Sequence, residues 1–440
     1  WYGSGHSKIS PEQAAKKKKL ERLVSSDTFP DNLKSVAVGC FECHGLNRLA
    51  HSDNFDHQNF KINVIVSPDD CGVCHPVEAS QYSNSKKANA LDILRKNPVY
   101  DMLIEAAVSI KEINSSGNKT VKSTEHTRNQ TCYACHGTEV KVMGRQTIST
   151  EIGEMSVPVL TNWPNQGVGR INPDKSKGSC TSCHPRHGFN IEIARKPHTC
   201  SQCHLEPDVP AWNVYKESKH GNIFSSLGSQ WNWKSVPWKL GKDFTAPSCA
   251  VCHNSLITTP AGDDIIINRS HDFGQRLWVR LLGLIYSHPQ PKNGRTYEIR
   301  NSASLSLPTS FNGEIAGNYL ISKLEEMDRI NSVKKLCTSC HGTFWTNQHF
   351  SSLDKTIRET DRMVMSSTNL IIDAWNKNIL DRINPFDEVA EQQWIIQWLF
   401  YANSIRYAAA MGGPDYAAFK NGWWSLNANL LEIQRSLKLK

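Results

Sequence analysis

A five-residue pattern, C-x-x-C-H, recurs seven times along this chain of 440 residues. The copies are Cys40-Phe-Glu-Cys43-His44, Cys71-Gly-Val-Cys74-His75, Cys132-Tyr-Ala-Cys135-His136, Cys180-Thr-Ser-Cys183-His184, Cys200-Ser-Gln-Cys203-His204, Cys249-Ala-Val-Cys252-His253 and Cys337-Thr-Ser-Cys340-His341. The chain has 14 cysteines, so every cysteine belongs to one of these motifs and none is left over.

The motif is the attachment signature of c-type haem: two thiols form thioethers with the porphyrin, and the adjacent imidazole binds iron. Zinc sites and redox dithiols also use C-x-x-C, but neither requires a histidine directly after the second cysteine. A disulfide framework is typical of short secreted chains. We therefore expect seven covalently bound haem c groups. The expected proximal iron ligands are His44, His75, His136, His184, His204, His253 and His341.

Composition agrees with a core that is partly cofactor, because only 39% of the residues are hydrophobic. Covalent haem attachment normally takes place outside the cytoplasm, which predicts a periplasmic or equivalent compartment. No signal peptide is visible at Trp1, so we expect the numbering to start in mature sequence. The longest apolar run, from Leu277 to Tyr286, contains Arg280. It is shorter than the roughly 20 residues of a spanning helix, so no transmembrane segment is predicted.

The formal net charge of +8 does not indicate a nucleic-acid partner. The basic run from Lys16 to Lys19 is interpreted as the solvated start of a helix. Haem propionates add negative charges that this count omits, and basic side chains near haem edges more often pair with propionates than with partners. The expected partners are therefore redox cytochromes, and no nucleic acid is expected.

The positions of the motifs divide the chain into two regions. Residues 1–341 are predicted to form a haem-binding body with all seven motifs, and residues 342–440 a haem-free helical region, predicted to serve oligomerisation. In the body, a helix is expected over Val99–Ile113, and strand signals are brief, near Lys61–Val66 and Ile265–Ile267. The predicted fold class is mainly α: a multihaem cytochrome c with a haem-packed core and long C-terminal helices.

The C-terminal region is predicted to form three helices, over Ser352–Asn378, Pro385–Met411 and Leu426–Leu437. The sequence Gly412-Gly413-Pro414 is expected to end the second of them. That helix carries a broad apolar stripe: Trp394, Ile395, Trp398, Leu399, Tyr401 and Ala402. The stripe either packs within the monomer or covers a neighbouring subunit, and the sequence favours neither.

Six-coordinate haem needs a second axial ligand, and ten of the 17 histidines lie outside the motifs. The best candidates are His187, His220 and His271, with His57 or His51 serving the first pair of motifs. Weaker candidates are His126, His288 and His349. His6 and His198 are expected at the surface.

An internal similarity concerns a lysine. The segment Glu217-Ser218-Lys219-His220-Gly221-Asn222 resembles Asn84-Ser85-Lys86-Lys87-Ala88-Asn89, with Lys87 in the place of His220. Two interpretations are open. Either Lys87 is itself an axial ligand, or the haem that a histidine there would have served is missing.

From Trp163 onward the chain resembles a known family. The resemblance lies in Trp163-Pro164-Asn165-Gln166-Gly167-Val168-Gly169-Arg170-Ile171-Asn172-Pro173-Asp174, then Cys183-His184-Pro185-Arg186-His187, Ala194-Arg195-Lys196-Pro197, Cys203-His204-Leu205-Glu206-Pro207-Asp208 and Tyr215-Lys216-Glu217-Ser218-Lys219-His220-Gly221. These stretches resemble the octahaem hydroxylamine oxidoreductase and hydrazine dehydrogenase family. The seven motifs match the family's second to eighth haems, so the first haem would be absent, which would explain Lys87.

The resemblance implies a trimer of haem-rich subunits that oxidises hydroxylamine or hydrazine, or reduces nitrite in some members. It places catalysis at one five-coordinate haem, matched here by the motif of His136. In oxidising members a C-terminal tyrosine is covalently joined to the catalytic haem of a neighbouring subunit. Gly412-Gly413-Pro414-Asp415-Tyr416 resembles that segment, which makes Tyr416 a candidate catalytic residue.

The sequence also departs from the family. The family's distal Asp-His pair is matched by Asp208, a candidate catalytic residue, but Val209 follows it and cannot transfer protons. Histidines before the Gly-Gly turn are absent from residues 403–410. The sequence therefore predicts an electron-transferring, catalytically reduced relative that forms a homotrimer or a hetero-oligomer with another multihaem subunit. The alternative is an oxidoreductase acting on hydroxylamine, hydrazine or nitrite at the haem of His136.

Overall fold

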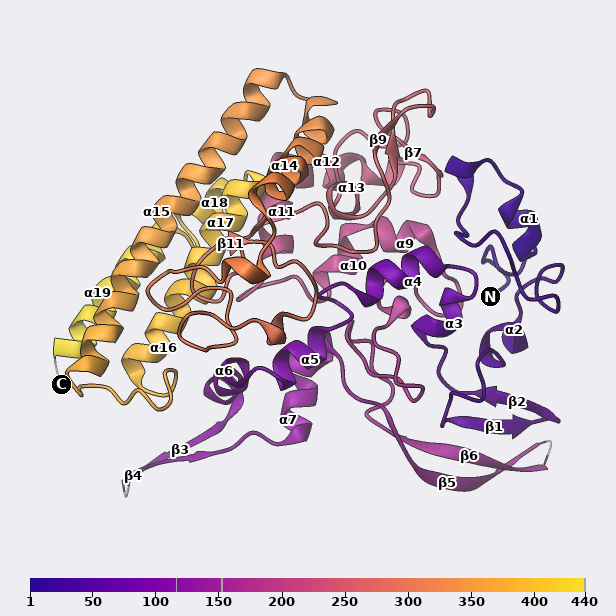
Figure 1. The fold of residues 1–440 in the computed structure, drawn as a ribbon, viewed down its shortest axis with the longest axis horizontal. Helices are drawn as coiled ribbons and strands as arrows, with labels where there is room; N and C mark the ends of the chain where they lie inside the picture. Colours follow the sequence, from indigo (N-terminus) through magenta and orange to yellow (C-terminus); the bar gives the residue numbers. More distant parts are fainter. Residues whose placement is uncertain (116, 152, 439–440) are drawn as a thin grey trace.

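The computed structural model describes residues 1–115, 117–151 and 153–438. Helix makes up 44% of the chain and strand 13%, which confirms the mainly α class. Figure 1 shows the long C-terminal helices on one side of the molecule, with the short helices and loops of the haem-binding body on the other.

The haem-binding body is built from short helical segments joined by loops. Its α-helices are α1 (Pro11–Ala15), α2 (Cys40–His44), α3 (Pro68–Gly72), α4 (Pro76–Ser83), α5 (Ala90–Arg95), α6 (Pro98–Val108), α7 (Glu125–Gln130), α8 (Cys132–His136), α9 (Ile191–Arg195), α10 (Pro197–Ser201), α11 (Ala211–Glu217), α12 (Lys219–Leu227), α13 (Cys249–His253) and α14 (Lys323–Thr338). Its 3₁₀ turns are η1 (Lys19–Glu21), η2 (Cys180–Ser182), η3 (Gly228–Gln230), η4 (Thr296–Glu298) and η5 (Gly317–Tyr319).

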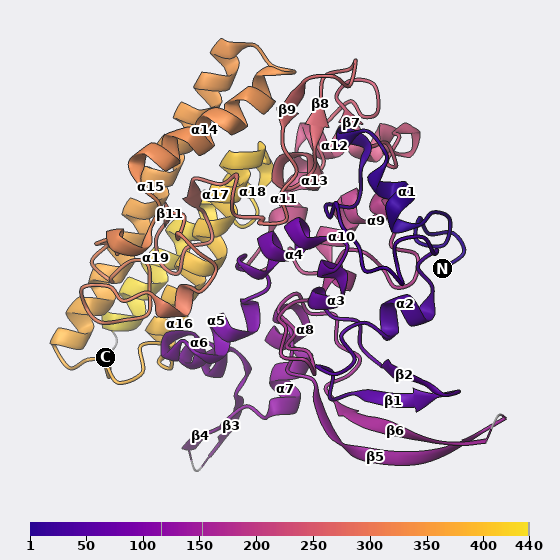
Figure 2. The same ribbon diagram turned by 45° about the vertical axis from the view of Figure 1, so that its right-hand side comes forward.

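The haem-binding body also contains several small sheets. The strands are β1 (Asn54–His57), β2 (Phe60–Asn63), β3 (Ile110–Asn114), β4 (Gly117–Val121), β5 (Lys141–Thr150), β6 (Gly153–Thr161), β7 (Trp238–Lys239), β8 (Ile257–Thr258), β9 (Ile265–Ile267), β10 (Val279–Arg280) and β11 (His288–Pro289). They pair as β1-β2, β3-β4, β5-β6, β10-β11 and the three-stranded β7-β8-β9, where only the β7-β8 pair is parallel. The β5-β6 hairpin projects from the body (Figure 2).

Two sequence predictions in the body need correction. The helix expected over Val99–Ile113 ends at Val108, because Ile110–Asn114 pairs with Gly117–Val121 as a hairpin. The long β5-β6 hairpin was not predicted, although the alternation of Met155, Val157 and Val159 is a strand signal.

The C-terminal region forms α15 (Thr343–Asn376), α16 (Val389–Ile395), the π-helical turn η6 (Ile396–Tyr401), α17 (Ala402–Met411), α18 (Pro414–Ala418) and α19 (Trp423–Lys438). Residues 439–440 of the predicted region lie outside the described residues. The second predicted helix starts at Val389 rather than Pro385, because a capping box between Glu388 and Glu391 begins it there. It ends as expected, with Gly412 in the left-handed conformation (φ 68°).

The apolar stripe of the C-terminal region packs inside the chain. Trp394, Trp398 and Ala402 are fully buried, in one cluster with Ile371 of α15 and Ile433 of α19. The same cluster includes Val99 and Leu284–Tyr286 of the body. One hydrophobic core therefore crosses the predicted boundary at residue 341.

Among the described residues, no helix is both long and apolar enough to cross a membrane.

Candidate haem centres

Each motif forms one helical turn. The backbone amide of the final histidine donates to the carbonyl of the first cysteine, as in His75 to Cys71 (2.9 Å), His204 to Cys200 (2.9 Å) and His341 to Cys337 (2.9 Å). Residues three and four apart lie on the same side of a helical turn. Both sulfurs and the imidazole are therefore presented together, as covalent haem attachment requires.

Three motif histidines face a second histidine. The ring centres are 6.5 Å apart for His44 and His187, 6.1 Å for His341 and His220, and 6.3 Å for His75 and His6. A metal–imidazole bond is about 2 Å, so two imidazoles on opposite sides of one iron have centres roughly 6 Å apart. The spacing of all three pairs fits a haem iron between them. His6, which the sequence places at the surface, joins this set.

His184 is within electrostatic range of His271. These two imidazoles interact electrostatically, and burial followed by His271 lowers the pKa of His184 to about 4. Backbone carbonyls orient other rings: Nδ1 of His44 donates to the carbonyl oxygen of Asn63 at 2.7 Å. A bond at Nδ1 directs Nε2 toward a metal, as in most metal-binding histidines.

The two histidines proposed for the first pair of motifs occupy other environments. Nδ1 of His57 lies 3.3 Å from the sulfur of Met155. Both nitrogens of buried His51 face carboxylates, with Nδ1 3.0 Å from Asp53 and Nε2 3.2 Å from Asp70. Burial lowers the pKa of His51, but hydrogen bonds to these two carboxylates outweigh it and raise the pKa to about 10. His51 is thus held as a structural cation.

The cysteines of different motifs approach one another. Cys71 and Cys180 lie within hydrogen-bonding distance, as do Cys135 and Cys203, and Cys200 and Cys249. Electrostatic interactions also connect Cys43 to Cys74, Cys183 to Cys200 and Cys252 to Cys337. In the haem-loaded protein these atoms are thioether sulfurs. These pairwise interactions link the motifs in the order first, second, fourth, fifth, sixth and seventh, and they link the third motif to the fifth.

The third motif is held by the glycine-rich stretch of the family-like block. The amides of Val168 and Gly169 donate to the carbonyls of Cys135 (2.9 Å) and His136 (3.0 Å). A Cβ on Gly167 would come within 2.3 Å of the backbone nitrogen of Gly137, itself at φ 102°. Only glycine allows two backbones to approach so closely. The backbone of residues 167–169 therefore packs directly against the backbone of the His136 motif.

Polar side chains gather beside His136. Asp208 lies close enough to Cys132, Cys135 and His136 to interact with each electrostatically. Arg280 of β10 interacts with His136, and Tyr407 of α17 with both Arg280 and Asp208. Burial raises the pKa of Tyr407 and lowers that of His136. Of these residues, the sequence identified only Asp208 as part of a site. Arg280 could have been found from the sequence, because it is a charged residue within the otherwise apolar run from Leu277 to Tyr286.

His288 lies on the same two-stranded ladder, opposite Arg280. Its side chain is buried, Nδ1 donates to the carbonyl oxygen of Pro289 at 2.7 Å, and Nε2 has no hydrogen-bond partner within the described chain. Burial lowers the pKa of His288 to about 3; the hydrogen bond to Pro289 opposes this shift, and the charge of Arg280 adds to it. This ladder thus pairs a neutral imidazole with Arg280, whose guanidinium interacts electrostatically with His136 of the third motif.

Tyr416 is buried in its own subunit, where it is 1% exposed and packs on Val214 and Ala408. Its hydroxyl donates to Glu206, two residues before Asp208. Burial and Glu206 raise its pKa. In this arrangement the phenol is enclosed by side chains of its own chain.

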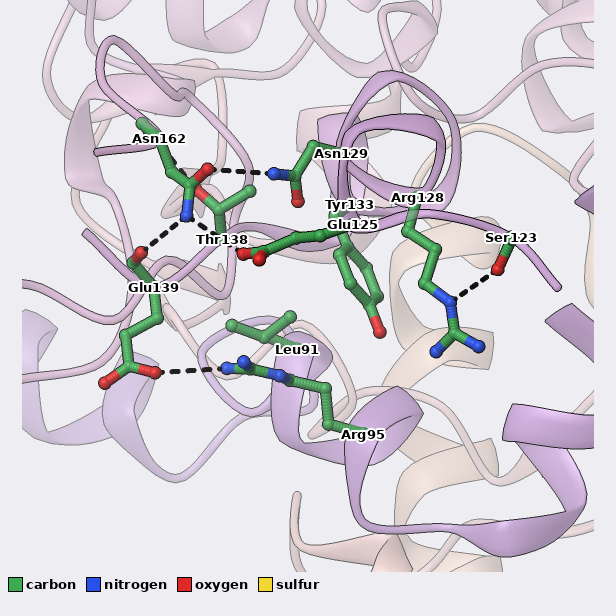
Figure 3. A pocket seen from close by; sticks show the side chains of 10 residues that line it. All are labelled: Leu91, Arg95, Ser123, Glu125, Arg128, Asn129, Tyr133, Thr138, Glu139 and Asn162. Carbon is green, nitrogen blue, oxygen red and sulfur yellow. Dashed lines mark hydrogen bonds and ion pairs between the residues drawn. The ribbon is translucent and has the colours of Figure 1, made fainter. Parts of the chain in front are cut away.

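A separate cavity of about 300 Å³ lies behind α8, with the ring of Tyr133 pointing into it (Figure 3). Its two arginines are already paired: Arg95 with Glu139 at 3.4 Å and Arg128 with Ser123 at 2.7 Å. Arg128 also bonds Asp101 and Glu105. Neither guanidinium is free to bind a ligand there.

Two family models match the chain. Residues 167–259 match the model described as "seven times multi-haem cytochrome CxxCH", and residues 70–156 match that of cytochrome c554 and c-prime. A probable nitrite reductase-hydroxylamine oxidoreductase fusion protein of Kuenenia stuttgartiensis is 31% identical over 234 residues, 43% of this chain and 26% of that protein. The chain thus spans about a quarter of the length of this curated relative.

Solved structures extend the similarity over the whole chain. A hypothetical multiheme protein is 40% identical with a TM-score of 0.92, covering 100% of this chain and 92% of that one. A Kuenenia stuttgartiensis complex described as a reducing HAO-like protein complex (HAO denotes hydroxylamine oxidoreductase) shares the fold, with 16% identity and a TM-score of 0.64, covering 100% of this chain and 81% of that one. The chain therefore belongs to the multihaem c-type cytochromes and shares the fold of HAO-like proteins.

Proposed function

We propose that this protein is an extracytoplasmic heptahaem cytochrome that conducts electrons along its row of haem sites, as a subunit of a larger assembly. The row of neighbouring sulfurs carries this proposal. Pairwise interactions between cysteines of successive motifs run from Cys43 at one end to Cys337 at the other. A redox-partner cytochrome at either end could then exchange electrons with every haem of the chain.

The first test is the haem count. Seven motifs predict seven covalent haem c groups per chain, which denatured mass spectrometry measures directly. The protein must be matured by a complete cytochrome c assembly system. A count of six or fewer on such material would contradict the proposal.

The second test interrupts the row. The double substitution Cys200→Ser and Cys203→Ser removes the fifth haem, where the third site joins the row. The matched control, Cys40→Ser and Cys43→Ser, removes a terminal haem. Each variant should carry one haem fewer, but only the first should strongly slow electron passage from the His136 site to the seventh haem, followed by stopped-flow spectroscopy. Equal rates in the two variants would contradict the proposed path.

A second function, oxidation or reduction of small nitrogen compounds at the His136 site, is favoured by one observation: Asp208, Arg280 and Tyr407 converge there. Bound haem would supply the redox chemistry, while Asp208 could hold a proton and Arg280 could orient a polar substrate. The variant Val209→His adds the missing base and should raise hydroxylamine or hydrazine oxidation, since general acid–base catalysis contributes about 10²–10⁴-fold. Val209→Leu is the size control. No gain from histidine would indicate a closed or six-coordinate site.

We also propose that residues 342–440 mediate assembly, as a homotrimer or with another multihaem subunit. Phe419, Trp424 and Leu431 are 81%, 77% and 62% exposed, although nearby Leu426 and Ile433 are buried. Large apolar side chains at the surface are typical of interaction sites when they cluster. The similarity to a solved complex of HAO-like proteins supports the same proposal.

A further inference from the structure

Lys87 lies at the fifth haem site. Its Nζ atom is 3.5 Å from Nε2 of His204, the histidine that ends the fifth motif. The two groups belong to segments 117 residues apart, so the fold brings them together. Lys87 also interacts electrostatically with Cys200 and Cys203, the thioether-forming residues of the same motif.

The segment that carries Lys87 is built like the one that carries His220. The hydroxyl of Ser85 donates to the carbonyl of Tyr82 at 2.6 Å, and that of Ser218 donates to the carbonyl of Tyr215 at 2.6 Å. The same hydroxyls accept from the amides of Ala88 (3.3 Å) and Gly221 (3.1 Å).

The asparagines two residues after the ligand position also correspond. Asn89 donates to the carbonyl of Ser85 at 2.9 Å, and Asn222 to that of Ser218 at 2.8 Å. Because these hydrogen bonds correspond one to one, the two segments have the same local conformation. It presents His220 to His341 in one place and Lys87 to His204 in the other.

The spacing and surroundings suit a metal ligand. A metal–nitrogen bond is about 2 Å, so two nitrogens on opposite sides of one iron are about 4 Å apart, close to the observed 3.5 Å. The Nζ atom of Lys87 lies over the ring of Phe273, 4.6 Å from the ring centre. The neighbouring Lys86 points elsewhere, with its Nζ donating to Gln290 at 2.8 Å. Only one of the two lysines therefore faces the motif.

We propose that Lys87 is the sixth ligand of the haem attached by Cys200 and Cys203, opposite His204. The ammonium releases one proton to solvent as the amine lone pair binds iron. The sequence left two interpretations open, and this proposal is the one in which Lys87 is itself an axial ligand. The haem site that Lys87 serves is present in the chain. The inference rests on haem c at the fifth motif and does not require catalysis at His136.

A histidine–lysine pair would distinguish the fifth haem from its neighbours. Axial-ligand identity is one of the main determinants of haem potential. The fifth motif contacts the third, fourth and sixth motifs through Cys203 and Cys200. The unusual ligand would therefore set the potential at the branch point of the row.

The test counts high-spin ferric haems per chain by electron paramagnetic resonance. Lys87→Ala should add one high-spin haem to the wild-type number and create one extra site for added cyanide. Lys87→His should keep that haem low-spin, with a shifted reduction potential in a spectroelectrochemical titration. An unchanged high-spin count in Lys87→Ala, with seven haems still attached, would overturn the proposal.

Matched controls separate ligation from general effects. Lys86→Ala removes a neighbouring cation and should leave the high-spin count and all potentials unchanged. His220→Ala removes the corresponding residue of the matching segment and should produce the same increase of one, at the seventh haem. If the Lys87→Ala variant does not accumulate, the Lys87→His variant alone decides the question. Replacement of one wild-type low-spin signal by a different low-spin signal supports ligation by Lys87, and an unchanged spectrum contradicts it. These readouts are spectral, so they do not depend on the electron-passage rates that test the proposed function.

Discussion

The haem-binding body and the C-terminal helices reach a folded state by different means. The body has short helices, and loops whose backbone bonds hold the motifs, as in the clamp of Val168 and Gly169 on the third motif. The C-terminal region has helix α15 of 34 residues, packed through fully buried Trp394 and Trp398. Helices of a single turn are not stable alone, whereas long amphipathic helices are stabilised by packing. The comparison teaches that haem must supply much of the core that the body's own side chains do not.

The largest expected effect comes from withholding haem. In chain produced without cytochrome c maturation, the body should lose its structure, because ligand binding and folding are coupled at such sites. Hydrogen exchange should show fast exchange around the first six motifs, and retained protection in α15, α19 and the body segments that share their core, at Val99 and Leu284–Tyr286. Slow exchange throughout the body of the haem-free chain would remove the distinction between the two regions.

The second prediction concerns the C-terminal core. Trp394 is fully buried and its indole nitrogen donates to Thr368 at 2.9 Å. Trp394→Ala should therefore lower the free energy of unfolding by about 3–5 kcal/mol, measured by denaturant titration of the helical circular dichroism signal. Haem content should stay at seven. A simultaneous loss of haem would show that the two regions are not separable.

The third prediction concerns the buried polar centre of the body. His51→Gln leaves the buried carboxylates of Asp53 and Asp70 without their cation, which should cost about 1–3 kcal/mol. The raised pKa of His51, about 10, also sets a pH dependence. Its stabilisation is complete below about pH 6.5 and is lost as pH rises toward 10. Thermal unfolding of the wild type should show this alkaline loss, and the variant should lack it; identical pH profiles would contradict a charged His51.

The smallest effect on stability is expected at the surface. Trp424 is 77% exposed, so Trp424→Glu should change the unfolding free energy by no more than about 0.5 kcal/mol. It should nevertheless reduce the assembled fraction in light scattering, because it places a charge on the proposed contact surface. Lys438→Glu, at the end of the same helix, is the control. An unchanged mass distribution for Trp424→Glu would exclude this face from assembly.

Local sequence rules predicted much of this molecule. Each C-x-x-C-H motif specifies its own helical turn, since the thiols and the imidazole must face one porphyrin. The helices around Trp394 and Leu426 follow from their apolar periodicity, and the end at Gly412 follows from its left-handed conformation. Errors arose where a non-local partner decides the conformation. Ile110–Asn114 becomes a strand because β4 pairs with it, a contact that helical periodicity does not report.

The sequence by itself predicted the haem-attachment motifs and the mainly α class, because these depend on spacing within a few residues. Only the tertiary structure decided which side chain faces which motif. It placed His6 opposite His75, bound His51 to carboxylates and buried Tyr416 within its own subunit. It also brought Lys87 to His204 and Arg280 to His136, across more than 100 residues in each case. Axial and pocket residues need only proximity in space, so no local pattern in the chain predicts their partners.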